Sequence, residues 1–389
     1  MKIKSVSAKI ILDSRKEKTI LISIKTNAGR TFSASSPSGK STGKYEAKPY
    51  KKSIEEDIEA IKQLQEYFTE EILEEFCDLN MVEDILDGHV GANTLFAFES
   101  AVLKAIAYEK KKEVWEIIDS NAGKTKKFPR LVGNCIGGGK HSNMEGKKPD
   151  FQEFLLIPES KSPKQAEEEN KKLKEKAELL IKIKDKNFNE EKNDENAWMT
   201  SLNEKEVLDI LNELNIPFGV DVASSGFYSR KKYHYENPML TRETDEQLGY
   251  LTNLMKNYNI IYIEDPFNEE DYESFSKLLT KFPDSLIVGD DLTVTNSKRL
   301  QKAIDKNSIN AIIVKPNQCG SLLEVKKVCD MAKENKIKIV FSHRSGETEE
   351  TILADLAFGF GADFFKCGIT GKEREAKINR FIAIEKKLK

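Results

Sequence analysis

The sequence predicts an α/β protein in which a small α+β unit precedes a larger region of alternating strands and helices. The first third of the chain opens with short alternating segments and then becomes helical. Farther along, short apolar runs alternate with helical patterns, and from Glu264 onward these runs end about 25 residues apart, the length of one βα unit. Such a pattern favours a parallel sheet, either open or closed into a barrel. A length of 389 residues accommodates both units.

Three strands and two helices are expected in the N-terminal unit. The strands are predicted at residues 2–12, 19–25 and 31–36, because apolar residues alternate or cluster there between turn residues. Apolar residues at helical spacing predict one helix from Ser53 to about Cys77 and a second from Asn93 to Lys110.

The ends of this unit carry recognisable signals. Ser53 is the expected N-cap of the first helix, with Glu56 three residues later as its capping-box partner. The polar stretch Asn121–Lys127 is the candidate linker to the second unit.

The second unit is predicted from a series of apolar runs that read as buried strands. A charge-dense stretch at 161–196 separates the first run from the rest, and we expect it to form a solvated helix and loop. The runs lie at 151–157, 217–221, 260–264, 285–290, 311–315, 337–343 and 362–366.

Ionisable residues stand at the ends of six of these runs. A buried strand end gains nothing from a charge unless that charge is paired or used. In a barrel of parallel strands, the residues at the carboxyl ends converge on one mouth. The six residues are Asp221, Glu264, Asp290, Lys315, His343 and Lys366.

The order of these residues suggests a chemistry. Asp221, Glu264 and Asp290 are hard oxygen donors of the kind that Mg²⁺ prefers. Lys315, near another cation and a bound metal, is expected to have a lowered pKa and to act as a general base. The alternative is a purely structural ring of salt bridges between the acids and the lysines.

Composition narrows the class of protein. Lys and Arg number 62 against 65 Asp and Glu, a net charge of −3, which argues against a nucleic-acid partner. The sequence contains no run of 18 apolar residues, so we expect no membrane span. The five cysteines form no CxxC pair, which favours a cytoplasmic location.

Longer motifs around these positions identify a family. The chain resembles the enolases, the phosphopyruvate hydratases, and its GGGKH-to-QEF spacing resembles the archaeal type. The resemblance implies an enolase-like fold, with an N-terminal α+β capping domain at 1–125 and a C-terminal (β/α)8-type barrel at 126–389. The motifs are ILDSR at 11–15, PSGKSTGKYEA at 37–47, GAN at 91–93, QEF at 152–154, VDVASS at 220–225, IEDPF at 263–267, GDDLTVTN at 289–296, NQCGS at 317–321 and SHRSGETEET at 342–351.

The resemblance further implies dehydration of 2-phosphoglycerate to phosphoenolpyruvate with two Mg²⁺ per active site during turnover, by a homodimer or higher homo-oligomer. Lys315 matches the base that removes the C2 proton, and Glu195 matches the general acid for hydroxyl loss, with Glu153 beside it. The metal ligands implied by the match are Asp221, Glu264 and Asp290 for the first Mg²⁺ and Ser41 for the second. The substrate contacts implied are His141, Gln152, His343, Arg344, Ser345 and Lys366.

Departures from the family pattern keep two alternatives open: a lyase for another carboxylate substrate, and a non-catalytic binding paralogue. The phosphate-contacting pair Arg344 and Ser345 argues against the first, and the retained Lys315 and Glu195 argue against the second. The departures are the charged turn Lys16–Lys18, Lys40 in place of a small residue, Asn196 in place of Gly and Gly226 in place of Glu.

Overall fold

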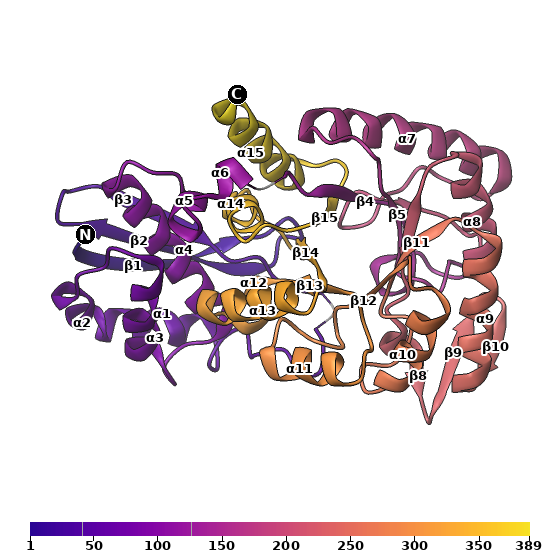
Figure 1. The fold of residues 1–389 in the computed structure, drawn as a ribbon, viewed down its shortest axis with the longest axis horizontal. Helices are drawn as coiled ribbons and strands as arrows, with labels where there is room; N and C mark the ends of the chain where they lie inside the picture. The colour runs from indigo at the N-terminus through magenta and orange to yellow at the C-terminus, as the bar shows by residue number, and fades with distance from the viewer. Residues whose placement is uncertain (41, 126) are drawn as a thin grey trace.

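The computed structural model of the chain describes residues 1–40, 42–125 and 127–389. Figure 1 shows an elongated molecule with a small sheet and its helices at one end and a barrel ringed by helices at the other. The chain starts in the small sheet, and its C-terminal helix α15 (Lys372–Leu388) runs along the outside between the two parts.

The N-terminal sheet has the predicted three strands. Strands β1 (Ile3–Leu12), β2 (Lys18–Thr26) and β3 (Thr31–Ser35) form an antiparallel meander in that order. The apolar side of β2 contributes Ile20, Ile22 and Ile24 to the core, each fully buried. Helix α4 (Ala92–Glu109) packs across β2 and β3, as expected for the second predicted helix.

The single helix expected from Ser53 to Cys77 is wrong. Ser53 does cap a helix, accepting a hydrogen bond of 3.1 Å from the Glu56 N–H, but the chain leaves the helix at residue 71 and reaches Leu73. There the Leu73 N–H donates to the Met1 carbonyl at 3.0 Å, so pairing with the start of the chain overrides helical spacing. The observed elements are α1 (Ile54–Gln63), α2 (Gln65–Glu70), the short turn η1 (Phe76–Asp78) and α3 (Leu79–Leu86).

Two short helices, α5 (Val114–Ile118) and α6 (Ala122–Thr125), lead to the barrel, and α6 occupies most of the stretch predicted as a linker. Within the described residues, eight strands close the barrel, because β15 pairs with β4. Around the barrel these are β4 (Arg130–Gly137), β5 (Glu153–Leu156), β7 (Phe218–Asp221), β11 (Ile260–Glu264), β12 (Leu286–Gly289), β13 (Ala311–Val314), β14 (Lys338–Ser342) and β15 (Phe364–Gly368).

The expectation of a wholly parallel sheet fails at one strand. Strand β5 runs antiparallel to both of its neighbours, β4 and β7. The physical reason is the connection, since β4 and β5 are joined by the loop 138–152, which holds only the short turn η2 (Gly139–His141) and no crossover helix. Strand β4 itself escaped prediction, because Gly133 and Asn134 interrupt its apolar run.

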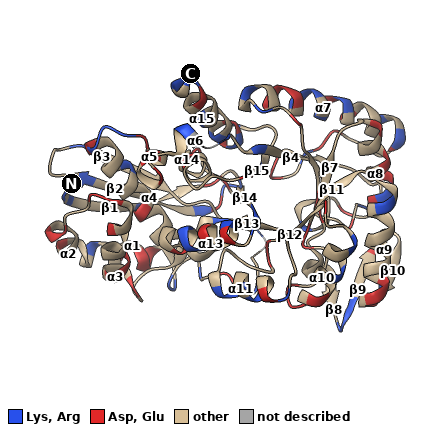
Figure 2. Cartoon of the chain, viewed as in Figure 1, with Lys and Arg blue, Asp and Glu red and all other residues tan. Residues whose placement is uncertain are grey.

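Helices surround the barrel and present interleaved charges to solvent (Figure 2). Helix α7 (Pro163–Lys184) is the charged helix predicted at 161–196, although Lys174 on it and Glu195 after it are buried rather than solvated. The other covering helices are α8 (Glu204–Glu213), α9 (Thr244–Asn257), α10 (Tyr272–Lys281), α11 (Ser297–Asp305), α13 (Leu322–Glu334) and α14 (Ile352–Gly359).

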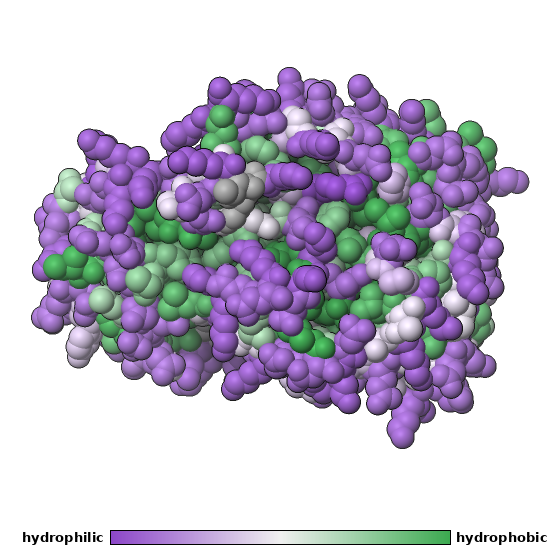
Figure 3. Space-filling model, viewed as in Figure 1, coloured by the Kyte–Doolittle hydropathy of each residue, from purple (hydrophilic) through white to green (hydrophobic). Residues whose placement is uncertain are grey.

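The remaining elements are short and lie in the loops. They are β6 (Trp198–Met199), η3 (Ser224–Phe227), α12 (Pro316–Cys319) and a small antiparallel sheet of β8 (Tyr228–Ser229), β9 (Lys232–Glu236) and β10 (Met239–Arg242). Figure 3 shows hydrophilic side chains over most of one face, with smaller apolar areas between them. In the described part of the chain, every helix is too short or too polar to cross a bilayer.

Candidate active site

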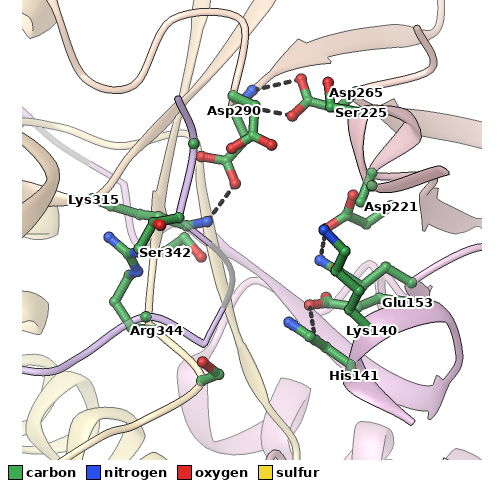
Figure 4. Close-up of a pocket in the computed structure, with 18 of the residues that line it drawn as sticks. Lys140, His141, Glu153, Asp221, Ser225, Asp265, Asp290, Lys315, Ser342 and Arg344 are labelled. Carbon is green, nitrogen blue, oxygen red and sulfur yellow. Dashed lines mark hydrogen bonds and ion pairs between the residues drawn. The ribbon is translucent and has the colours of Figure 1, made fainter. Parts of the chain in front are cut away.

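The strand ends of the barrel meet in one cavity of about 230 Å³, shown in Figure 4. The sequence-predicted residues that line it are His141, Gln152, Glu153, Glu195, Asp221, Asp290, Lys315, His343, Arg344, Ser345 and Lys366. Glu264 lies behind this wall, fully buried. Ser41 lies outside the described residues.

Lys366 lies at the centre of a cluster of carboxylates. Its ammonium is 2.9 Å from Asp221 Oδ2, 2.8 Å from Glu264 Oε2 and 3.2 Å from Glu153 Oε2. Burial alone would lower the pKa of Lys366, but the charges of Asp221, Glu153 and Glu264 outweigh it and raise the pKa well above its usual value. One ammonium is thus surrounded by three buried carboxylates.

This surplus of negative charge helps to raise the pKa of two of these carboxylates. Burial and the neighbouring charge of Asp221 raise the pKa of Glu264 well above its usual range. The pKa of Asp221 is also raised, mainly by burial, although Lys366 acts in the opposite direction. Buried oxygen donors with unbalanced charge are suited to a bound hard cation.

Asp290 lies across the cavity from this cluster and is paired with Lys315. Its second oxygen accepts a hydrogen bond of 3.1 Å from Gln318 Nε2. Burial by itself would lower the pKa of Lys315, but Asp290 outweighs burial and raises it. Asp290 therefore shifts the pKa of Lys315 in the direction opposite to the lowering expected from a neighbouring cation, while Arg344 and Lys366 act to lower it.

Two groups of possible metal ligands in the described residues differ from the ligand set implied by the resemblance. Oxygen atoms of Asp265, Asp290 and Asp291 lie within 4.8 Å of one another, as do ligand atoms of a second group described below. Asp265 is engaged, since it accepts the backbone N–H groups of Asp290 at 3.0 Å and Asp291 at 2.7 Å. Asp265 thus orients the backbone that carries Asp290, and its position directly after Glu264 was the signal that could have found it.

Glu195 lies in the second such group, with His141 and Glu153. Its carboxylate is 3.4 Å from His343 Nε2 and 3.6 Å from His141 Nδ1. It also accepts a 2.9 Å hydrogen bond from Asn134 Nδ2, a residue that sequence reasoning missed together with its strand. Burial would raise the pKa of Glu195, but the two histidines outweigh it and hold the pKa well below its usual range.

His343 responds in the opposite direction. Burial would lower its pKa, but the Glu195 carboxylate raises it to about 9, so the imidazole is protonated at neutral pH. The pKa of His141 is raised for the same reason, against burial, by Glu195 and by Glu153 3.2 Å away. Glu195 therefore lies between two histidines, and its charge raises the pKa of both.

Arg344 and Ser345 contact the N-terminal part of the chain. Arg344 Nη1 is 2.9 Å from Glu46 Oε2, and Ser345 Oγ accepts a 2.7 Å hydrogen bond from the Lys40 N–H. A Cβ at Gly39 would lie 2.0 Å from Arg344 Nη2, so a larger residue there would displace the guanidinium. The segment before residue 41 is thus seated directly on this edge of the cavity.

Asn196 and Gly226, two of the residues that depart from the family pattern, also lie at the site. Asn196 adopts a left-handed backbone with φ of 60°, which asparagine tolerates and which keeps the turn that Gly would form. A Cβ at Gly226 would lie 3.4 Å from Lys140 Cε. Lys140 also lines the cavity, makes no hydrogen bond or ion pair with any described residue, and was not singled out in the sequence.

A closed barrel with a cluster of acids, lysines and histidines at the carboxyl ends of its strands defines a TIM-barrel enzyme. Two family models match the chain, "Enolase, N-terminal domain" over residues 3–118 and "Enolase, C-terminal TIM barrel domain" over residues 125–389. The chain belongs to the enolase family, and by that membership it is a lyase of the phosphopyruvate hydratase class.

Curated relatives support the same membership. The enolase of Natronomonas pharaonis is 36% identical, and the match covers 98% of each chain. The enolase of Methanosphaera stadtmanae is 35% identical over 99% of this chain and 97% of its own length. That of Pyrobaculum aerophilum is 34% identical over 90% of this chain and 87% of its own length.

Proposed function

We propose that the chain catalyses the Mg²⁺-dependent dehydration of 2-phosphoglycerate to phosphoenolpyruvate, a step of glycolysis and gluconeogenesis. The observation that carries this proposal is the arrangement of the cavity. Lys315 and Glu195 both line it, and the carboxylates Asp221 and Asp290 line it with them. A base, an acid and a cation-binding set in one enclosed space are what an elimination next to a carboxylate requires.

The chemical difficulty is the C2 proton, which is weakly acidic because its loss adds a second negative charge beside the carboxylate. A cation held by Asp221, Glu264 and Asp290 would supply positive charge where that second charge develops. Lys366, among the same carboxylates, adds the protein's own charge there.

Lys315 accepts the C2 proton in this proposal. Its pairing with Asp290 raises its pKa and holds a proton on it. A cation held by Asp290 would weaken the pull of that carboxylate on the Lys315 proton and so lower the pKa of the base.

Glu195 delivers a proton to the departing C3 hydroxyl. Its own pKa is held low, and the titratable group nearest to its carboxylate is His343, whose Nε2 lies 3.4 Å away. We propose that the Glu195–His343 pair holds the proton that leaves with the hydroxyl, with His141 and Glu153 completing the pair's surroundings.

Arg344 and Ser345 are proposed to bind the phosphate, and Gln152, which donates to Asp221 at 3.4 Å, to border the substrate. Arg344 would exchange the Glu46 carboxylate for the phosphate, because both are anions that suit a guanidinium. Ser41 is proposed to meet the second Mg²⁺.

We further propose a homodimer or higher homo-oligomer in the cytoplasm, with the chain divided at residues 1–125 and 126–389. Light scattering of the purified protein measures the assembly, and a monomer at all concentrations would contradict that proposal. Expression of each segment alone tests the division.

The function itself is tested by incubating the purified protein with 2-phosphoglycerate and MgCl₂ and following the ultraviolet absorbance of phosphoenolpyruvate. We expect turnover that is abolished by a chelator and restored by added Mg²⁺. Absence of product across a range of Mg²⁺ concentrations and temperatures, from protein that is folded by circular dichroism, would overturn the proposal.

A further inference from the structure

Lys174 is a buried lysine that lies outside the substrate cavity. It is on α7, is 4% exposed, and its ammonium forms no ion pair with a carboxylate of the described residues. Instead, Nζ donates a hydrogen bond to the main-chain oxygen of Asn196 and one of 2.8 Å to Thr370 Oγ1. It also lies over the ring of Trp198, 5.6 Å from its centroid.

The Asn196 carbonyl belongs to the tight turn that carries Glu195. Inside this turn, Asn193 Oδ1 accepts the N–H of Glu195 at 3.0 Å and that of Ala197 at 2.9 Å. These bonds shape the turn but do not attach it to the barrel. Lys174 supplies an attachment at the residue that directly follows the proposed acid.

Thr370 links the same ammonium to the strand that carries Lys366. It lies two residues after the end of β15 at Gly368, and its carbonyl accepts a 3.2 Å hydrogen bond from Asn196 Nδ2. Lys174, Asn196 and Thr370 therefore form a closed set of contacts that joins the Glu195 turn to the end of β15.

On the other side of the turn, the main-chain contact is longer. Arg374 Nη2 is 3.5 Å from the Asp194 carbonyl, at the limit of a hydrogen bond, and donates more strongly to Ser345 at 2.8 Å. The contact from Lys174 is the shorter of the two main-chain contacts that flank Glu195.

Burying an ammonium without a carboxylate is costly, and a neutral side chain of the same length would avoid that cost. What the charge provides is a pair of stronger, charge-assisted hydrogen bonds at one carbonyl and one hydroxyl. We propose that Lys174 is a positioning residue for Glu195. It fixes the place of the acid relative to the strand that bears Lys366. This inference rests on the proposed function.

The experiment compares the full-length wild type with Lys174→Met, which removes the charge at similar length, and Lys174→Gln, which keeps a donor. The matched control is Lys176→Met, on the exposed side of the same helix. Each protein is incubated with Mg²⁺ and 2-phosphoglycerate in D₂O. Product formation is followed by absorbance, and exchange of the C2 hydrogen is followed by proton NMR.

We expect Lys174→Met to lower kcat for dehydration by about 10- to 100-fold, because a displaced acid is a poor acid. C2 exchange, which needs Lys315 and not Glu195, should stay within a few-fold of wild type, and KM should change little. Lys174→Gln should be intermediate, and Lys176→Met should match the wild type in both assays.

Two results would overturn the inference: an unchanged kcat in Lys174→Met, or an equal loss of exchange and dehydration, which would indicate a general structural role. If Lys174→Met does not fold, Thr370→Val removes only the hydroxyl that Lys174 contacts. This variant must lose more dehydration than C2 exchange, by a smaller factor than Lys174→Met. An equal loss of both activities in Thr370→Val also overturns the inference. A wild type that fails to convert 2-phosphoglycerate contradicts the proposed function instead.

Discussion

Lys40 Nζ lies 3.1 Å from Asp194 Oδ2 and 2.6 Å from Asn143 Oδ1, so one side chain connects three loops around the cavity. These loops are the N-terminal segment before residue 41, the β4–β5 loop and the turn that carries Glu195. Lys40 stands where the family usually has a small residue. This departure therefore adds contacts between the segment before residue 41 and two loops at the cavity.

Lys40→Ala is expected to raise KM for 2-phosphoglycerate by about 2- to 5-fold with a smaller effect on kcat, since a partly exposed ion pair contributes about 1 kcal/mol or less. Steady-state kinetics in low salt measures it. In an Asp194→Asn background the same substitution should cost less, as a double-mutant cycle requires for a direct pair. An equal increase in KM in both backgrounds would show that Lys40 and Asp194 do not interact in the working enzyme.

Lys315→Ala is expected to reduce dehydration by about 10²-fold or more and to abolish C2 hydrogen exchange, because the proposed base is removed. Binding of 2-phosphoglycerate, measured by calorimetry with Mg²⁺, should persist. Lys327→Ala, on the exposed side of α13, is the control and should behave as wild type. Exchange that survives in Lys315→Ala would mean that another group is the base.

Gly226→Glu restores the residue that the family usually has and places a carboxylate next to Lys140, whose Nζ is 3.6 Å from the position of the new Cβ. Among the described residues, Lys140 at the cavity wall has no ion-pair partner, so pairing it should weaken attraction of an anionic substrate. We expect kcat/KM to fall a few-fold and to depend less on ionic strength. Gly226→Ala should leave both unchanged, and a similar loss in that variant would point to backbone strain.

Mg²⁺ is expected to raise the Tm of the wild type by several degrees, because a ligand that binds only the folded state stabilises it. Glu264→Gln, which removes one buried oxygen donor, should show a smaller shift or none, whereas Glu191→Gln, in an exposed loop, should respond like the wild type. Differential scanning calorimetry without substrate measures this independently of activity. An undiminished shift in Glu264→Gln would remove Glu264 from the proposed ligand set.

The contribution of Lys174 to the free energy of unfolding should become less unfavourable as pH rises. Burial lowers its pKa from 10.5 to about 8, with Cys135, Lys192 and Glu178 as the charges that also act on it. Below pH 8 the folded protein carries the full cost of the buried charge, about 3 kcal/mol at 1.36 kcal/mol per pKa unit. Between pH 8 and 10.5 the unfolded chain binds the extra proton, so the free energy of unfolding rises with pH.

Lys174→Met lacks this titration. The free energy of unfolding of the variant minus that of the wild type should therefore be largest at pH 7 to 8 and decline toward pH 10. Cys135, with a pKa raised by burial to about 12, stays neutral in this window. Urea unfolding at several pH values measures the difference, and a difference that does not vary with pH would show that Lys174 does not titrate there.

Much of the site could be predicted because its residues stand at the ends of apolar runs. Asp221 and Glu264 end β7 and β11, and Lys315 directly follows β13, as the sequence pattern indicated. Lys174 could not be found in this way, since nothing in a Lys- and Glu-rich helix distinguishes one lysine as buried. Asn134 was missed because the strand that carries it contains two glycines.

The sequence by itself determined which residues are available for chemistry and roughly where the strands end, because periodicity and motifs are local properties. The tertiary structure alone decided the reversed direction of β5, the break in the helix after Ser53 and the raised pKa of Lys315. The direction of β5 follows from the helix-free connection to β4, whereas the other two depend on partners distant in the chain: Met1 for Leu73, and Asp290 for Lys315. Local spacing cannot specify such partners, and a buried charge takes its pKa from the neighbour that the fold places beside it.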